Sequence, residues 1–406
     1  MLPIRMIHTA DLHIGVENYG RWNPTSGLHA RLEDYLASLD QVVAYAIAQA
    51  ADVFLVAGDI YKTKDPSPTQ QREFAKRIRR LTSAGIQVVL LVGNHDQPAR
   101  HGDANPLDIY ASLELEDVTI FRRPEMVTIK TRQGPLQVAG MPHLSRGFLM
   151  ARQAHVPRTL HESERLLENV IDEILVSLAG DVDPTIPAVL TAHLSIDCAS
   201  LGSERDLMLG KGLTLPLASL AQPAFDYVAM GHIHKHQVIG EGPCCVYPGS
   251  LDRIDFGEES DDKGFMDVTV ERGKTTHVRV PITVRPFKTV KVDLMDSISP
   301  TDDLVAGIRR TDIEGAAVRL AYTLQAERAN MIDERAVSEA LTGAFDVVWR
   351  PELIPGTTRG RHPELTEALS GSPLVALEKY LALKPELGER AELLLAGARE
   401  LMAEEL

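Results

Sequence analysis

Residues 53–61 read VFLVAGDIY, and this stretch decides the fold. Val53 to Ala57 form an unbroken apolar run, which is typical of a strand buried on both faces. Gly58 follows at once and permits a sharp turn, and Asp59 comes next. Open α/β sheets build their binding sites beyond the carboxyl ends of central strands. The stretch therefore predicts a central strand whose end presents the Asp59 carboxylate to a site.

The rest of the chain places similar strands and helices around this one. Strands are predicted at 5–9 and 87–92, and amphipathic helices at 28–51 and 70–83, the second capped by Thr69. Further strands are expected at 188–192 and 227–230, and residues 246–250 and 264–270 are expected to form a second, antiparallel sheet. The pattern predicts an α/β fold in which two mixed sheets carry helices on both outer faces.

The downstream part of the chain has a different character. Residues 281–350 alternate short strands and helices, which predicts a small α+β domain after a first domain at 1–280. Residues 351–362 contain prolines and glycines typical of a linker. Residues 363–406 are acidic and helical, and carry apolar stripes suited to packing on a partner or on the chain itself.

Composition limits the class of protein. A length of 406 residues suggests two or three domains. The chain has no signal-peptide pattern, no apolar run near the ~18 residues of a membrane span, and only three cysteines. We therefore expect a cytoplasmic protein without a membrane partner. The net charge of −15 argues against a protein that coats nucleic acid by general attraction, but not against an enzyme that acts on it.

Five predicted strands end in histidine, aspartate or asparagine. One such residue is usually an ordinary turn or a hydrogen-bonded histidine, but five in succession indicate a shared site. Imidazole, carboxylate and amide ligands without thiolate suit Mn²⁺, iron or Zn²⁺, and two such ions make a clamp for phosphoryl chemistry. The residues at these ends are Asp11, His13, Asp59, Asn94, His95, Asp96, His193, His232 and His234.

These blocks, D-x-H, G-D, G-N-H-D, H and G-H-x-H, occur in the order found in the calcineurin-like metallophosphoesterase superfamily, which residues 5–250 resemble. Several longer blocks are similar to bacterial DNA nuclease subunits within this superfamily. These blocks are IHTADLHIG at 7–15, AGDIY at 57–61, GHIHK at 231–235 and YPGSLDR at 247–253, the last followed by FGE at 256–258. The resemblance implies a four-layer αββα sandwich, a capping role for 281–350 and a partner-binding role for 363–406.

The resemblance also implies a role for each residue. Asp11, His13 and His234 would hold one metal ion, Asn94, His193 and His232 the other, and Asp59 would bridge them. His95 would assist the leaving group or stabilise the transition state; its alternative role is to orient a neighbouring ligand. Lys62 stands where relatives have a further histidine, so it is either a phosphate contact or a solvated lysine.

The implied activity is that of a metal-dependent DNA exonuclease and endonuclease. Its cofactors would be two divalent ions. Mn²⁺ is the favoured ion, and Mg²⁺ or another divalent ion is the alternative. Its partners would be DNA and a coiled-coil ATPase subunit, with the chain as a homodimer within a heterotetramer. No phosphate-binding loop of the G-x-x-x-x-G-K-[ST] type occurs here, so ATP dependence would come from the other subunit.

Two questions stay open at this point. The same core could serve a metallophosphatase or a small-molecule phosphodiesterase, or a scaffold without activity, although the complete ligand set argues against the scaffold. The DNA contacts are also open: Arg205, in a loop that contains glycine and basic residues but also Glu204 and Asp206, and Arg253 are weak candidates beside Lys62. No feature suited to reading base edges is evident, which predicts cutting without strong sequence preference.

Overall fold

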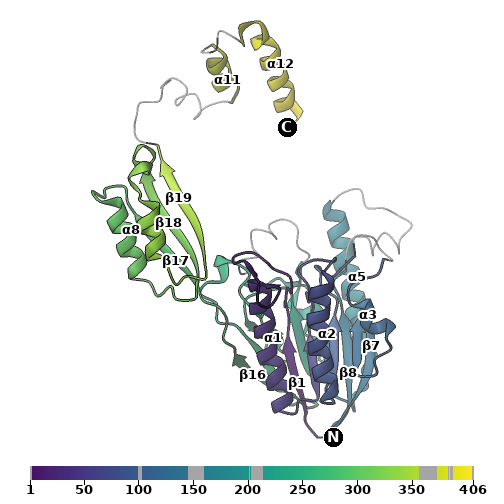
Figure 1. Cartoon of the computed structure of the whole chain (residues 1–406). Coiled ribbons are helices and arrows are strands. Elements are labelled where there is room, and N and C mark those ends of the chain that lie inside the picture. Colours follow the sequence, from purple (N-terminus) through teal and green to yellow (C-terminus); the bar gives the residue numbers. More distant parts are fainter. Residues whose placement is uncertain are drawn as a thin grey trace. The chain divides into compact units, whose positions relative to one another are not determined.

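The computed structural model describes residues 2–98, 103–144, 160–200, 202, 214–355, 373–382, 384 and 387–404 (Figure 1). Its first sheet has six strands in the order β16-β15-β1-β4-β5-β6. β1, β4, β5 and β6 run parallel, β15 pairs antiparallel with β1, and β16 pairs antiparallel with β15 at the edge of the sheet. The strands are β1 (Ile4–Thr9), β4 (Val53–Val56), β5 (Gln87–Leu91), β6 (Val118–Phe121), β15 (Gly264–Val270) and β16 (Thr276–Pro281).

The second sheet also has six strands, in the order β13-β14-β12-β9-β8-β7. β14, β12, β9 and β8 run parallel, while β13 and β7 are antiparallel edge strands. The strands are β7 (Glu125–Thr131), β8 (Gly134–Met141), β9 (Ala188–His193), β12 (Tyr227–Gly231), β13 (Gln237–Ile239) and β14 (Cys245–Tyr247). Each sheet thus has a parallel centre, which requires apolar cover on both faces.

The strand that carries Asp59 shows how the layers form. Phe54 and Val56 on one face of β4 pack in a core with side chains of α1 (Ala30–Ala48) and α2 (Pro68–Ser83). Val53 and Leu55 on the other face pack in a core that includes strands of the second sheet. The outer face of the second sheet is covered by α5 (Leu160–Gly180) and α7 (Leu217–Leu220). The four-layer αββα arrangement is confirmed.

Two local expectations are wrong. Residues 246–250 and 264–270 do not share a sheet: β14 pairs in parallel with β12 in the second sheet, whereas β15 pairs with β1 in the first. Residues 246–250 are a short apolar run that ends in turn residues, and residues 264–270 partly alternate; neither pattern specifies the neighbouring strand. Helix α2 begins at Pro68 rather than after Thr69, because Ser67 forms a reciprocal capping box with Gln70. Proline suits the first helical position, and such a cap contributes about 1 kcal/mol.

Short elements complete this part of the chain. They are β2 (Trp22–Asn23), β3 (Leu28–His29), α3 (Asp108–Ser112), β10 (Ser195–Ile196), β11 (Thr214–Leu215) and the 3₁₀ turn η1 (Phe256–Glu258). The first two pair as a small ribbon ahead of α1, so the predicted helix at 28–51 loses its first two residues to a strand.

A third sheet follows, with the order β17-β18-β19. Its strands and accompanying helices are β17 (Phe287–Asp293), α8 (Pro300–Arg309), β18 (Ala317–Gln325), η2 (Ala326–Met331), α9 (Glu334–Ala340) and β19 (Asp346–Ile354). β19 therefore includes the first four residues of the segment 351–362 predicted as a linker. The helices α11 (Pro373–Ala382) and α12 (Gly388–Glu404) lie in the final segment.

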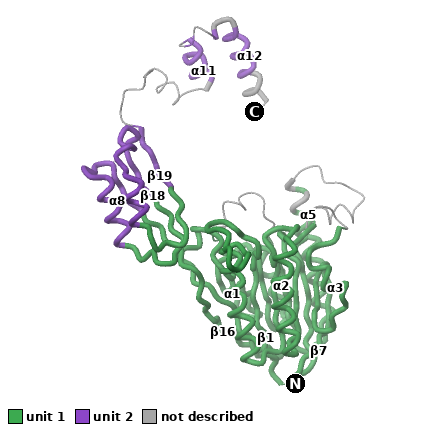
Figure 2. Tube along the Cα trace, viewed as in Figure 1, with its two compact units in different colours: residues 1–290, 311–320, 341–349 green, residues 291–310, 321–340, 350–406 purple. Residues whose placement is uncertain are grey.

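The chain divides into two compact units (Figure 2). The first comprises residues 1–290, 311–320 and 341–349, and the second comprises 291–310, 321–340 and 350–406. Each strand of the third sheet contributes residues to both units. This division is different from the domain boundary predicted at residue 280, and that boundary stays a prediction. Within the described ranges, no helix combines the length and the apolar character needed to cross a membrane.

Candidate metal centre

The candidate residues follow strands of both large sheets, and backbone hydrogen bonds hold their loops together. The amide of Asp11, after β1, donates to the carbonyl of Gly58 at 3.1 Å, and the amide of His13 donates to the carbonyl of Asp59 at 3.0 Å. In the second sheet, His193 of β9 lies opposite Gly231 of β12, next to His232. Parallel neighbours end at the same edge of a sheet, so side chains distant in sequence meet here.

One group of side chains consists of Asp11, His13 and His234. Their candidate ligand atoms lie within 4.8 Å of one another. The Nε2 atoms of His13 and His234 are only 3.1 Å apart, and Nδ1 of His13 is buried without a hydrogen-bond partner. Two imidazole nitrogens directed at each other in this way suit a shared cation better than an isolated hydrogen bond. This group fits one metal ion.

A second group consists of Asn94, His193 and His232. The side-chain oxygen of Asn94 is 3.0 Å from Nε2 of His193 and 3.0 Å from Nδ1 of His232. Nδ1 of His193 donates to the carbonyl of Ala57 at 2.8 Å, so its Nε2 carries the lone pair when the ring is neutral. Amide oxygen and imidazole nitrogen therefore converge on one position, as a second ion requires.

Asp59 lies between the two groups. Its Oδ2 atom is 3.3 Å from Nε2 of His193 and 3.8 Å from Nε2 of His13, so a single oxygen faces one member of each group. Its Oδ1 atom accepts a hydrogen bond from the amide of His95 at 2.9 Å. The carboxylate is thus oriented by the backbone and can serve both groups with one oxygen.

The backbone of this site is unusual. Asp11, His13, Asp59 and His232 all have positive φ angles, of 51°, 43°, 51° and 94°. Residues with a side chain rarely adopt this region, although aspartate and histidine are enriched in it, and the strain persists only where the surrounding structure enforces it. Four of the seven predicted ligands are held in this way, which is typical of a functional site rather than of ordinary turns.

Burial and charge shift the protonation of the cluster. Burial lowers the pKa of His13 and of His232 well below the usual value, so both rings are neutral near pH 7. Burial opposes charge on Asp59 too, but the neighbouring His193 outweighs it and holds the pKa of Asp59 well below its usual value. Neutral imidazoles and an ionised carboxylate are the forms that ligate metal ions.

His95 is oriented by its neighbours. Its Nδ1 lies 2.9 Å from the carbonyl of Lys62, to which it donates, and its ring packs edge-on against that of His13 at 5.0 Å. Nε2 is therefore turned to the cluster, 4.0 Å from Oδ2 of Asp59, and the side chain is 37% exposed. His95 thus combines contact with the cluster and a side chain exposed enough to reach a substrate.

The weak DNA-contact candidates are placed differently. The amide of Lys62 donates to Ile14 beside the cluster, and its cationic charge contributes to the lowered pKa of His13, so Lys62 lies near the candidate centre. The guanidinium of Arg253 instead donates to the carbonyls of Glu258, Asp261 and Arg285, which ties its loop together. Arg205 lies outside the described residues.

Three further residues belong to the site, although sequence reasoning gave them no role. The buried carboxylate of Asp96 accepts from the amides of Ile60, Tyr61 and Gly93, and so joins the Asp59 loop to the Asn94 loop. His143 stacks at a tilt on His232, with ring centres 6.2 Å apart. Glu258 accepts from Nδ1 of His234 at 2.9 Å. Asp96 and Glu258 stood in motifs visible in the sequence, but Ile60 and Tyr61, His232, and His234, the partners that give the three residues their places in the site, are remote in the chain.

Gly93 gives a test of how tightly the site is packed. A Cβ atom there would lie 2.1 Å from Oδ1 of Asp59 and 2.3 Å from its amide nitrogen. We expect Gly93→Ala to displace the Asp59 loop, lower the free energy of unfolding by about 1–3 kcal/mol and weaken metal binding. Gly180→Ala is the matched control, because nothing lies within 4 Å of its added Cβ. Urea unfolding and Mn²⁺ titration measure both effects; equal behaviour of the two variants would contradict the packing described.

Comparison with known proteins agrees with this geometry. The family model described as calcineurin-like phosphoesterase matches residues 4–236. The chain is 27% identical over 300 residues to the SbcD subunit of nuclease SbcCD from Escherichia coli K12, which covers 72% of each chain. It is 27% identical over 400 residues to the SbcD subunit from Rhodobacter capsulatus, which covers 91% of this chain and 90% of that one. The narrower resemblance to nuclease subunits is confirmed.

A solved structure with some likeness is a dimetal phosphatase from Danio rerio. It is 9% identical, with a TM-score of 0.37 over 69% of this chain and 99% of the other, and a likeness so distant carries no argument about substrate. The family model, by contrast, matches more than half of the sequence and includes all the candidate ligands. The chain therefore belongs to the calcineurin-like phosphoesterase family.

Proposed function

We propose that this protein is a metal-dependent DNA nuclease that hydrolyses phosphodiester bonds as an exonuclease and an endonuclease. The observation that carries the proposal is the position of Oδ2 of Asp59 between two groups of imidazole and oxygen ligands. The SbcD relatives carry the name nuclease, and one of them matches 91% of this chain, which supports DNA as the substrate.

The ligand set supports two ions. Asp11, His13 and His234 would hold one, Asn94, His193 and His232 the other, and Asp59 would bridge them. When bound, such ions lower the pKa of water and neutralise the phosphate oxygens of an in-line displacement. Mixed oxygen and imidazole ligands favour Mn²⁺ as the resident ion, with Mg²⁺ or another divalent ion as alternatives.

The chain's own groups supply the remaining chemistry. His95, oriented by the hydrogen bond from Nδ1 to the carbonyl of Lys62, would act as the imidazolium, in which Nε2 also carries a proton to donate to the leaving oxygen. The Lys62 ammonium would attract a phosphate as a point charge near the cluster. Asp96 would hold the Asp59 loop and the Asn94 loop in place relative to each other through the hydrogen bonds that its carboxylate accepts from three backbone amides.

We further propose that the chain works with an SbcC-type coiled-coil ATPase, as a homodimer within a heterotetramer, on double-strand ends and hairpins in repair and recombination. Helices α11 and α12 pack against each other and are joined by an ion pair between Glu378 and Arg399. They nevertheless expose large apolar side chains, with Leu393 at 78%. Exposed leucines on a helical pair suit a helical partner. The residues concerned are Val375, Tyr380, Leu393 and Leu394.

Deleting residues 363–406 tests this docking surface. We expect the truncated chain to lose co-elution with the ATPase subunit on a sizing column while keeping its basal Mn²⁺-dependent nuclease activity. The reason is that the candidate metal centre lies wholly in the first compact unit, whereas this segment belongs to the second. Unchanged complex formation would contradict the assignment of this surface.

The function itself is tested by an assay on linear and hairpin duplexes with Mn²⁺, with EDTA as the control. We expect both duplexes to be cut with Mn²⁺ and neither with EDTA. A small phosphomonoester such as 4-nitrophenyl phosphate serves as the competing substrate. Efficient turnover of the monoester with no cutting of DNA would instead favour a metallophosphatase on the same core.

A further inference from the structure

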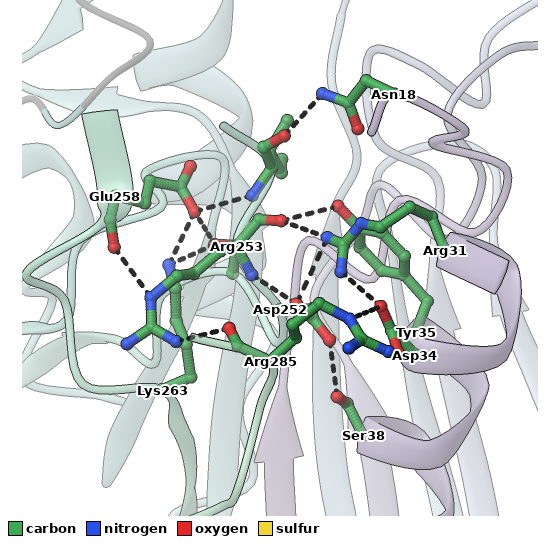
Figure 3. Close-up of polar contacts among 12 residues, drawn as sticks. Asn18, Arg31, Asp34, Tyr35, Ser38, Asp252, Arg253, Glu258, Lys263 and Arg285 are labelled. Carbon is green, nitrogen blue, oxygen red and sulfur yellow. Dashed lines mark hydrogen bonds and ion pairs between the residues drawn. The ribbon is translucent and has the colours of Figure 1, made fainter. Parts of the chain in front are cut away.

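A buried carboxylate stands behind the candidate metal ligand His234. Glu258 is fully buried, and its Oε1 accepts from Nδ1 of His234 at 2.9 Å. Its Oε2 accepts from Nζ of Lys263 at 2.7 Å, from the hydroxyl of Ser250 at 3.0 Å and from the amide of Ile254 at 3.1 Å. The hydrogen bonds around Oε2 are drawn in Figure 3. Both carboxylate oxygens are thus engaged, and the orientation of Glu258 is fixed by three chain segments.

This arrangement determines how His234 can act. Because Nδ1 donates to Glu258, the lone pair of the neutral ring is on Nε2, the atom that faces His13. A ligating histidine usually donates its other nitrogen to a carboxylate or carbonyl, which fixes both the tautomer and the ring orientation. Glu258 is therefore a positioning residue for His234.

The next residue in the chain holds a different part of the molecule. The carboxylate of Glu259 accepts from the amide of Thr289 at 2.9 Å and from its hydroxyl at 2.5 Å. Thr289 lies in β17, the first strand of the third sheet, and its hydroxyl oxygen also accepts from Nε and from a terminal nitrogen of Arg319 in β18. Side chains in a 3₁₀ turn are about 120° apart, so adjacent carboxylates there face different neighbours.

Packing strengthens the same connection. The ring of Phe256, two residues before Glu258, lies 5.0 Å from that of Phe287 in β17, and the guanidinium of Arg319 lies over it at 4.8 Å. Tyr19 packs edge-on against both rings. Within four residues, η1 and Glu259 therefore contact β17, β18 and a candidate metal ligand.

We infer that the segment Phe256–Glu259 couples the third sheet to the metal centre: Glu258 positions His234, and Glu259 links that position to Thr289 of β17. A displacement of β17, by DNA or by a partner subunit, would then change the affinity for the ion that His234 holds. The inference rests on the proposed two-ion function and adds a regulatory input to it. Since coupling is reciprocal, metal binding must also stabilise the Thr289 contact.

Titration of the full-length chain with Mn²⁺ alone, followed by calorimetry, tests this coupling. We expect Glu258→Gln to lower the affinity for one of the two ions by about 10- to 100-fold. We expect Thr289→Val, which replaces the hydroxyl with a methyl group and keeps the amide bond to Glu259, to weaken the binding of the same ion by about 2- to 30-fold. The matched controls Glu116→Gln and Thr276→Val alter exposed side chains and should leave both affinities unchanged.

Hydrogen exchange gives a readout that does not depend on activity. Mn²⁺ should slow the exchange of the amides in residues 287–290 of the wild-type protein, and Thr289→Val should reduce that protection. If Thr289→Val binds both ions as the wild type does and keeps the protection, the link to β17 is overturned. If Glu258→Gln binds both ions normally, its positioning role is overturned.

Two further outcomes are informative. Glu258→Gln removes the buried negative charge that faces Lys263, and this can unfold the chain. If the single variant unfolds, the double variant Glu258→Gln with Lys263→Met is titrated instead, because it removes both buried charges. If the wild-type protein itself binds no pair of ions, the proposed function fails and the coupling with it. If the wild type binds two ions and the variants match it, the coupling alone fails.

Discussion

Replacing Asp59 with asparagine is expected to lower Mn²⁺-dependent DNA cleavage by at least about 10³-fold, because metal ions supply several kcal/mol of transition-state stabilisation. Oδ2 of Asp59 is the atom that faces both His13 and His193. An amide lacks the negative charge needed to hold two cations at that position. The variant should therefore fail to bind at least one of the two ions, rather than bind both ions and cleave DNA slowly.

The asparagine variant should keep its fold. Oδ1 of residue 59 accepts from the amide of His95, and an asparagine oxygen can accept the same bond. Loss of cleavage with an unchanged circular-dichroism spectrum is the expected pair of results. Asp65→Asn, an exposed aspartate six residues later, serves as the control and should cleave as the wild type does. Full cleavage by Asp59→Asn would contradict the bridging role.

The second large effect concerns His95. We expect His95→Asn to reduce kcat on DNA by about 10²–10⁴-fold while Mn²⁺ affinity stays close to that of the wild type. The ring lies 4.0 Å from Asp59 and is partly exposed, which suits contact with a leaving group better than permanent ligation. The measurement pairs single-turnover cleavage with a Mn²⁺ titration of the same sample.

The nature of the leaving group separates two roles for His95. An activated diester such as bis(4-nitrophenyl) phosphate releases a stable anion that needs no proton, so its hydrolysis should suffer much less from His95→Asn. His277→Gln, a partly exposed histidine on β16, is the control. Equal loss on both substrates together with weakened metal binding would show that His95 acts by orienting Asp59 instead.

Much of this site could be predicted from the sequence because each ligand follows an apolar strand. Parallel strands that are buried on both faces have a strong local signature, and their ends meet wherever the sheets are placed. Asp11, Asp59 and His193 are examples: each lies at or just beyond the end of a strand found close to its predicted range. The clustering followed from topology and required no knowledge of side-chain contacts.

The support around the site could not be predicted in the same way. Glu258 belongs to a short 3₁₀ turn, and its contacts with His234 and Lys263 join positions 24 and 5 residues away. The placement of β15 in the first sheet, away from β14, could not be predicted for a similar reason, because the polarity pattern of a strand specifies its faces but not its neighbour. Asp96 belongs to a motif visible in the sequence, but its hydrogen bonds to three backbone amides form only because the Asp59 loop and the Asn94 loop lie side by side.

Anomalous diffraction from crystals soaked in Mn²⁺ most directly tests whether seven side chains, with Asp59 at their centre, bind a pair of cations. We predict two anomalous peaks about 3.5–4 Å apart, both within ligand distance of Oδ2 of Asp59. One peak should contact His13 and His234, and the other Asn94, His193 and His232. A single ion, or two ions that do not share Asp59, would contradict the account.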